Sequence, residues 1–423
     1  MLIVNLLPIF IVVTLLVLKK HMLVAGLAGA AAAVVISFFS TSDTIELAQA
    51  NSTLAGGVGT LLGFTTPILY AATAAMLGKA GCFKSAVVAL QRVLGGKIAI
   101  LAAAIVIIQA FATYMAGMGA GNTMVIAPLM MAVVGANPWV IAGMALATAV
   151  CFTTSPSSTE TILAAEYAGV AYVGDFAATM MPFTIGVVLF GAALAFYGVY
   201  KKGSLIEGDA DQAENMTEVS TGQLFMRAIP AITMLTLVVL GGTINGWIGT
   251  PVILPFVTVI FVSILTLIFT PIKVDALCDD VIDSSKFILT TLFGVGVFLG
   301  FINIIALSGV FDQLAELVGE APGFLVLPTA MIFAFLIAVP SGAFVAGVLP
   351  LILPTLALLG LSPMAMGMIA ISAGFGSQIS PVQINVAALA GSFKKDILWV
   401  VKSNLKFVLT AFGALLIISL FIN

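Results

Sequence analysis

The chain has 423 residues, of which 61% are hydrophobic and 8% are charged, and its mean hydropathy is +1.25. A soluble domain carries about 25% charged residues, so this composition excludes a water-soluble globular protein and predicts an all-α polytopic membrane protein of about ten spans. The net charge of −3 says little, but the absence of basic clusters larger than pairs argues against a nucleic-acid partner.

The first apolar stretch, residues 2–18, is followed rather than preceded by basic residues. A signal peptide has the opposite order, so this stretch predicts a retained span with its N-terminus outside, in a multi-pass protein of the inner (plasma) membrane. Further spans are expected near 22–40 and 54–78. The basic, moderately apolar segment 79–97 is expected to be a helix along the cytoplasmic surface.

Residues 98–138 form an apolar stretch that is too long for one straight span and contains glycines at 117, 119 and 121. It predicts either two crossings or a re-entrant hairpin that turns at these glycines, and we favour the hairpin. A broken helix is expected over 139–168, because the hydroxyl-rich sequence CFTTSPSSTETI (151–162) interrupts an apolar run. A span near 178–200 returns the chain to the cytoplasm.

A polar, acidic stretch at 203–222 predicts a cytoplasmic linker that divides the chain into halves 1–202 and 223–423. The second half repeats the pattern of the first at a constant offset, so that Pro138 falls on Pro363 and Pro156 falls on Pro381. Each half is therefore expected to be one structural repeat.

The second repeat predicts a hairpin at 323–360 and a broken helix at 361–391, preceded by a span near 287–308. No Lys or Arg occurs between Lys286 and Lys394, whereas the corresponding part of the first half is basic. The second repeat is therefore expected to be inverted in the membrane. Inverted repeats with discontinuous helices are typical of secondary transporters, which bind substrate near the bilayer midplane.

Four polar elements are expected to meet there: the hairpin tips 117–123 and 340–347, and the helix breaks 153–160 and 378–385. The candidate substrate-binding residues are Asn122, Thr123, Ser157, Ser158, Ser341, Gln383 and Asn385. The candidate cation-binding residues are Gly117, Asn122, Thr154, Glu160, Ser377 and Gln378. Amides and helix N-termini suit an anion, and carbonyl and hydroxyl oxygens suit Na⁺. The alternative is that these hydroxyls bond to helix carbonyls and serve packing.

Glu160 is the only acidic side chain predicted deep in the membrane. Such a carboxylate is expected to bind a cation or to carry a proton. The alternative is that its helix lies shallower and that Glu160 reaches water.

Two motifs resemble the ion transporter superfamily, which includes the divalent anion/sodium symporters. One is the Asn-Thr in GAGNTMVIAPLM (119–130), and the other is the Ser-Pro-containing break found at 155–158 and 380–383. The stretch SPSSTETILAAEYAGVAYVGDFAATMMPF (155–183) is similar to anaerobic C4-dicarboxylate carriers of the DcuC type. The resemblance implies an elevator-type carrier, usually a homodimer, in which a transport domain slides along a scaffold domain.

The expected function is secondary active transport of small carboxylates, C4-dicarboxylates among them, coupled to Na⁺ or H⁺ and needing no other cofactor. Two alternatives stay open: a cation/proton antiporter without an organic substrate, and the membrane subunit of a tripartite carboxylate transporter. An enzyme is not expected, because the sequence offers no His, Cys or paired-carboxylate constellation for catalysis.

Overall fold

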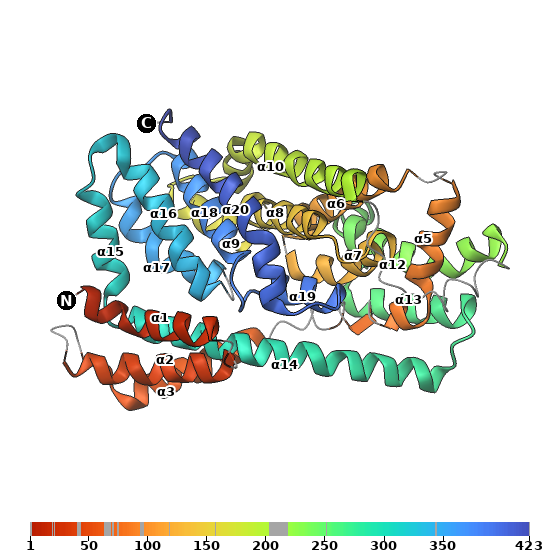
Figure 1. Ribbon diagram of the computed structural model, residues 1–423, viewed down its shortest axis with the longest axis horizontal. Helices are drawn as coiled ribbons and strands as arrows, with labels where there is room; N and C mark the ends of the chain where they lie inside the picture. Colours follow the sequence, from red (N-terminus) through yellow and green to blue (C-terminus); the bar gives the residue numbers. More distant parts are fainter. Residues whose placement is uncertain are drawn as a thin grey trace.

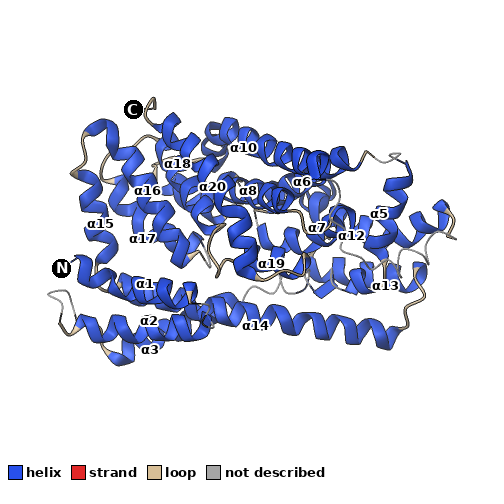
Figure 2. Cartoon of the chain, viewed as in Figure 1, coloured by secondary structure: helices blue, strands red, loops and turns tan. Residues whose placement is uncertain are grey.

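The computed structural model describes residues 2–18, 20, 22–39, 44–62, 69, 72–73, 76–93, 97–117, 119–156, 158–202, 219–250, 252–342 and 345–422. Its regular elements are α-helices, and these residues contain no β-strand (Figure 2). The predicted all-helical class is therefore confirmed. The linker predicted at 203–222 lies outside the described residues except at its last four positions.

One group of helices lies along the lower edge of the molecule in Figure 1. It consists of α1 (Leu2–Val17), α2 (Met22–Ser37), α3 (Leu47–Leu62) and the long α14 (Val274–Ala306). Glycines allow α3 and α14 to approach closely, because a Cβ on Gly57 would collide with the backbone nitrogen of Gly300. Such small-residue contacts are the usual way in which membrane helices pack tightly.

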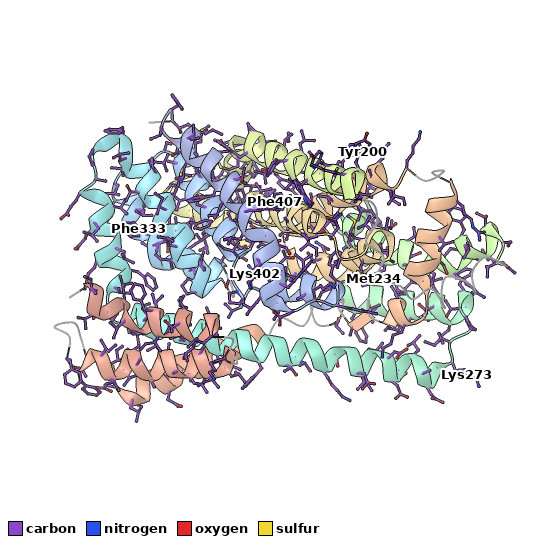
Figure 3. The ribbon with its side chains drawn as sticks, viewed as in Figure 1. Tyr200, Met234, Lys273, Phe333, Lys402 and Phe407 are labelled. Atoms are coloured by element: carbon purple, nitrogen blue, oxygen red, sulfur yellow. The ribbon has the colours of Figure 1, made fainter. Side chains whose placement is uncertain are left out.

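Helix α14 begins well before the span expected at 287. Its first turns contain Asp275, Asp279 and Asp280, and acidic residues stabilise a helix N-terminus through its dipole. Lys273, which precedes the helix, lies at the end of α14 that is farthest from α3 (Figure 3). The apolar span is therefore extended by a polar helical segment that hydropathy alone does not reveal.

A second group contains α5 (Cys82–Val93), α12 (Thr221–Ile248) and α13 (Pro255–Phe269), with α12 in contact with the other two. The remaining helices form the main body. They are α6 (Ile98–Ala116), α7 (Gly119–Val134), α8 (Pro138–Thr154), α9 (Thr159–Tyr167), α10 (Val173–Lys202), α15 (Val310–Gly319), α16 (Gly323–Ser341), α17 (Val345–Ala357), α18 (Pro363–Ser377), α19 (Ile384–Ser392) and α20 (Ile397–Ser419).

Helices α8 and α18 lie at the centre of this body and contact each other. Residues 140–154 of α8 and 365–377 of α18 are buried throughout, as expected for helices that are apolar on every side. They cross closely at Gly374, where a Cβ would lie 2.7 Å from Cγ2 of Thr153. The two helices that lead into the predicted breaks therefore share one core.

The hairpin and the breaks arise from local backbone chemistry. Helix α6 ends at Gly117, which has φ 67° and donates its N–H to Thr113 O, so the chain turns at the first glycine of the cluster. Helices α8 and α9 are bent by 48° around Ser155 and the following residues. On the other side, α18 ends at Gln378, and α19 begins after Gln383.

Within the described part of the chain, three helices are long and apolar enough to cross a membrane: Val173–Lys201, Gly323–Pro340 and Ile397–Ser419, with the bent pair α8 and α9 as a fourth if it is one span. Several other apolar helices are shorter, including Leu23–Ser37 and Ile98–Tyr114. Large apolar side chains such as Leu189 of α10, which is 57% exposed, cover the outside of the body. The chain is thus compatible with a helical membrane protein, while the number of about ten spans and their orientation stay predictions.

Candidate functional site

A chain of buried hydrogen bonds joins the first hairpin to the second broken helix. Thr123 of α7 donates from Oγ1 to Asn385 Oδ1 of α19 over 2.5 Å. Asn385 Nδ2 donates to Gln378 Oε1 over 2.7 Å, and Gln378 Nε2 donates to Ser377 Oγ over 3.0 Å. Gln383 Nε2 reaches the same Ser377 oxygen at 3.0 Å. Residues from opposite halves of the sequence therefore share one polar network inside the protein.

Gln109 extends this network into α6. Its Nε2 donates to Thr123 Oγ1 over 2.8 Å and to Thr148 Oγ1 of α8 over 2.7 Å, and Gln109 and both threonines are buried. Sequence reasoning missed Gln109 as a site residue. The available signal was that it is the one amide side chain in the apolar run IAILAAAIVIIQAFATYMA, where an unused polar group would be costly.

Side chains of Gln383 and Asn404 form hydrogen bonds with the backbone at the second break. Gln383 is the N-cap of α19, and its Oε1 accepts from the backbone N–H of Asn385 over 3.3 Å. Asn404 of α20 donates from Nδ2 to Gln378 O over 2.9 Å and thereby satisfies a carbonyl freed at the end of α18. Side-chain amides therefore satisfy backbone groups that lack helical partners at this break.

The first break uses hydroxyls instead of amides. Ser158 caps α9 by accepting the N–H of Thr161 at 3.1 Å, and Ser155 Oγ donates to Tyr114 O of α6 over 2.5 Å. Thr154 Oγ1 donates to Val150 O and accepts from Thr184 of α10 at 2.8 Å.

Glu160 lies in the first turn of α9 and is 8% exposed, in a helix that contacts α17 and α18. The alternative in which this side chain reaches water is therefore not supported by its burial.

The structure places the predicted site residues in two environments. Thr123, Asn385, Gln378, Ser377 and Gln383 belong to the network, and Asn122 is buried beside Thr123. The remaining candidates lie elsewhere: Gly117 ends α6, whereas Thr154, Ser158 and Glu160 belong to the first break. Ser157 and the side chain of Ser341 lie outside what the structure describes.

The second hairpin tip also touches the second break. A Cβ on Gly342 would lie 2.7 Å from Ser380 Cβ and 3.0 Å from Ser377 Cα, so this close approach depends on glycine. In the first hairpin tip, Gly119 and Gly121 differ in how closely they are packed. A Cβ on Gly119 would lie 2.5 Å from Thr148 Cγ2, whereas one on the buried Gly121 would meet no described atom within 4 Å. Among the described residues, the position beside Gly121 is therefore open to a small group.

This region offers amide and hydroxyl groups for binding a ligand. The described residues contain no group of three or more His, Cys, Asp or Glu side chains that could hold a metal ion. The network consists of neutral amides and hydroxyls, which can donate to a carboxylate or coordinate a hard monovalent cation.

Neither a protein-family model nor a curated protein matches the chain.

Proposed function

We propose that the chain is a secondary active transporter of small carboxylates, C4-dicarboxylates among them, coupled to Na⁺ or H⁺. The observation that supports this most is the buried hydrogen bond between Thr123 on a helical hairpin and Asn385 at the start of a broken helix. Buried polar groups cost free energy unless they are hydrogen-bonded, and inside membrane proteins they commonly mark substrate or ion pathways.

The proposed fold is an inverted repeat of two halves. In its support, the offset that places Pro138 on Pro363 also places both ends of α6 (98–116) on those of α16 (323–341), and both ends of α9 (159–167) on those of α19 (384–392). The contacts between the halves correspond in the same way: α7 of the first half packs on α19 of the second, and α17 of the second half packs on α9 of the first. Each hairpin thus packs against the broken helix of the other half, which is how two interlocked repeats would build one central binding region.

A carboxylate fits this region better than a cationic or apolar substrate. Side-chain amides and the start of α19 offer N–H donors, and helix N-termini favour negative charge. A buried anion without a basic partner needs a co-bound cation to offset its desolvation, which supplies the physical reason for coupling to Na⁺ or H⁺.

The proposed movement is an elevator in which the main body slides along a scaffold containing α1, α2, α3 and α14. In support of this division, α3 and α14 pack through glycines as a unit, whereas α1 and α14 touch the body through α15, α16 and α19. A homodimer held by the scaffold, in the inner membrane with its N-terminus outside, completes the proposal.

The burial of Glu160 favours one second candidate, a cation/proton antiporter without an organic substrate. In that case replacement of Glu160 by Gln would abolish cation-driven proton flux in vesicles that contain no carboxylate. A tripartite membrane subunit would instead need a binding-protein partner before it moved any substrate.

The test is uptake of labelled succinate into proteoliposomes that contain the purified protein, at clamped pH, with and without an inward Na⁺ gradient. A second arm replaces the Na⁺ gradient by a pH gradient. Gradient-dependent uptake is the expected result. If neither gradient drives uptake of succinate or of other small carboxylates, the proposed function is wrong.

A further inference from the structure

One chain of hydrogen bonds in the network runs in a single direction, starting at Gln109. Its amide gives one proton to Thr123 and the other to Thr148, so each threonine oxygen acts as an acceptor toward it. Thr123 then donates to Asn385 over 2.5 Å, with Gly119 O as a second acceptor at 3.1 Å, Asn385 donates to Gln378, and Gln378 donates to Ser377. Asn385 and Gln378 each accept at the oxygen and donate from the nitrogen, so the dipoles align and polarise one another.

The negative end of this aligned chain is Gln109 Oε1. That oxygen is buried and has no hydrogen-bond partner among the described residues. An amide oxygen inside a protein is rarely left in this condition, because it loses its bonds to water without replacement. The alignment makes the position still more negative than an isolated carbonyl, so it attracts a positive charge.

A second buried oxygen lies one helical turn away on the same face of α6. Thr113 Oγ1 has no hydrogen-bond partner among the described residues, and Thr113 is fully buried. Other buried threonines of the body behave differently: Thr153 and Thr154 donate to the carbonyl four residues earlier. Residues at i and i+4 are neighbours on a helix surface, so Gln109 and Thr113 share one face of α6.

We propose that Gln109 Oε1 and Thr113 Oγ1 bind a monovalent cation, Na⁺, with water completing its coordination shell. Oxygen-only ligands suit a hard cation, and the absence of any carboxylate in α6 disfavours a divalent ion.

This site lies on the first arm of the hairpin, away from the tip residues Gly117 and Asn122. Its role in coupling rests on the proposed function: a cation at Gln109 would strengthen the dipole chain toward Asn385, where the carboxylate is proposed to bind. The binding itself can be measured without any transport.

The experiment measures the thermal unfolding midpoint of the full chain in detergent as a function of NaCl, with KCl and choline chloride as reference salts. Thr113→Val is the informative variant, because it removes the free oxygen, keeps the shape and breaks no described hydrogen bond. Thr258→Val is its matched control, since Thr258 Oγ1 on α13 is also buried without a described partner.

In the wild-type protein, NaCl is expected to raise the midpoint above the values in both reference salts. Thr113→Val is expected to raise the half-saturating Na⁺ concentration by about tenfold, a typical effect of one lost ligand, and Thr258→Val to leave it unchanged. Gln109→Leu is expected to remove the Na⁺ effect.

The site is refuted if NaCl and choline chloride give the wild type equal midpoints, if Thr113→Val responds like the wild type, or if both threonine variants lose the response equally. An absence of succinate uptake would leave this result standing, so the failures of the site and of the proposed function are distinguishable.

Discussion

The two helix breaks precede α9 and α19, which correspond when the halves are aligned, and the breaks differ in chemistry. The break after α18 is lined by Gln378, Gln383 and Asn385, which belong to one network of neutral amides and hydroxyls. The break after α8 contains Ser158 and Glu160, a hydroxyl cap followed by an acidic residue. Corresponding places in the two halves therefore hold neutral hydrogen-bonding groups in one case and an acidic side chain in the other.

The residues at corresponding positions near the two breaks also differ in polarity. When the halves are aligned with Pro138 on Pro363, Gln109, Thr123 and Thr148 correspond to Ala334, Val348 and Ala373, which are also fully buried. Asn385 thus faces polar partners, whereas the position corresponding to Thr123 beside α9 is apolar. If the halves are repeats, they have diverged in chemistry while keeping their helix boundaries. The comparison therefore separates the neutral network at the second break, which contains the proposed substrate site, from the acidic side chain of Glu160 at the first.

The largest effect is expected from Asn385→Leu, which should abolish succinate uptake. The variant leaves Gln378 Oε1 without its partner, at a cost of about 1–3 kcal/mol of folding free energy, and it removes the shorter hydrogen bond of Thr123, whose Oγ1 keeps Gly119 O as an acceptor at 3.1 Å. Asn404→Leu is the matched control on α20, because it removes one hydrogen bond to Gln378 O and leaves the network intact. Equal loss of uptake in both variants would show that the network has no special role.

The second effect concerns the other break. Glu160→Gln keeps the size of the side chain and removes its charge, so we expect folded protein whose uptake no longer responds to a pH gradient. Uptake rates across a series of external pH values, in the wild type and the variant, provide the measurement. A variant with an unchanged pH response would place proton coupling elsewhere.

Substitutions at Gly119 and Gly121 of the first hairpin distinguish an effect on helix packing from an effect on substrate binding. Gly119→Ala places a methyl group 2.5 Å from Thr148 Cγ2 and is expected to cost about 1–3 kcal/mol of stability. Gly121→Ala meets no described atom and is expected to leave stability unchanged while raising the succinate concentration for half-maximal uptake. Thermal unfolding and uptake curves distinguish the two, and the assignment of free space beside Gly121 is wrong if both variants unfold equally early.

The smallest effect is expected far from both breaks, at the exposed pair Asp283 and Lys286. The Lys286 ammonium, 2.8 Å from Asp283, lowers the pKa of that carboxyl. The contribution of the pair is present above the ordinary pKa of an aspartate and is lost as the pH falls through the lowered value. Lys286→Met should raise the pKa of Asp283 in an NMR titration and leave uptake unaltered.

The sequence predicted the local features of this fold better than the long-range ones. The glycine cluster that begins at Gly117 and the polar stretch around Ser155 were visible, because a turn and a helix break each need specific residue types. The polar extension of α14 was not visible, because hydropathy marks apolar spans and not helices as such. Gln109 was missed for a different reason. A single amide in an apolar helix does not reveal its hydrogen-bond partners, and only the folded structure brings Gln109 to Thr123 and Thr148.

The sequence predicted that the hairpin tips and breaks of the two halves meet, but it did not predict which residues pair. Thr154 and Thr123 are both threonines beside predicted breaks, yet Thr154 bonds to Thr184 of its own half and Thr123 bonds to Asn385 of the other. Spacing along the chain does not determine which face of a helix meets which neighbour, since that depends on packing between helices.

We propose that a carboxylate crosses the membrane through the junction of α7 and α19. The most direct measurement is Na⁺-gradient- or pH-gradient-driven uptake of labelled succinate, in parallel proteoliposomes of the wild type, Asn385→Leu and Asn404→Leu. Uptake by the wild type and Asn404→Leu, and none by Asn385→Leu, is the expected result. Absence of uptake by the wild type, or undiminished uptake by Asn385→Leu, would show that the proposal is wrong.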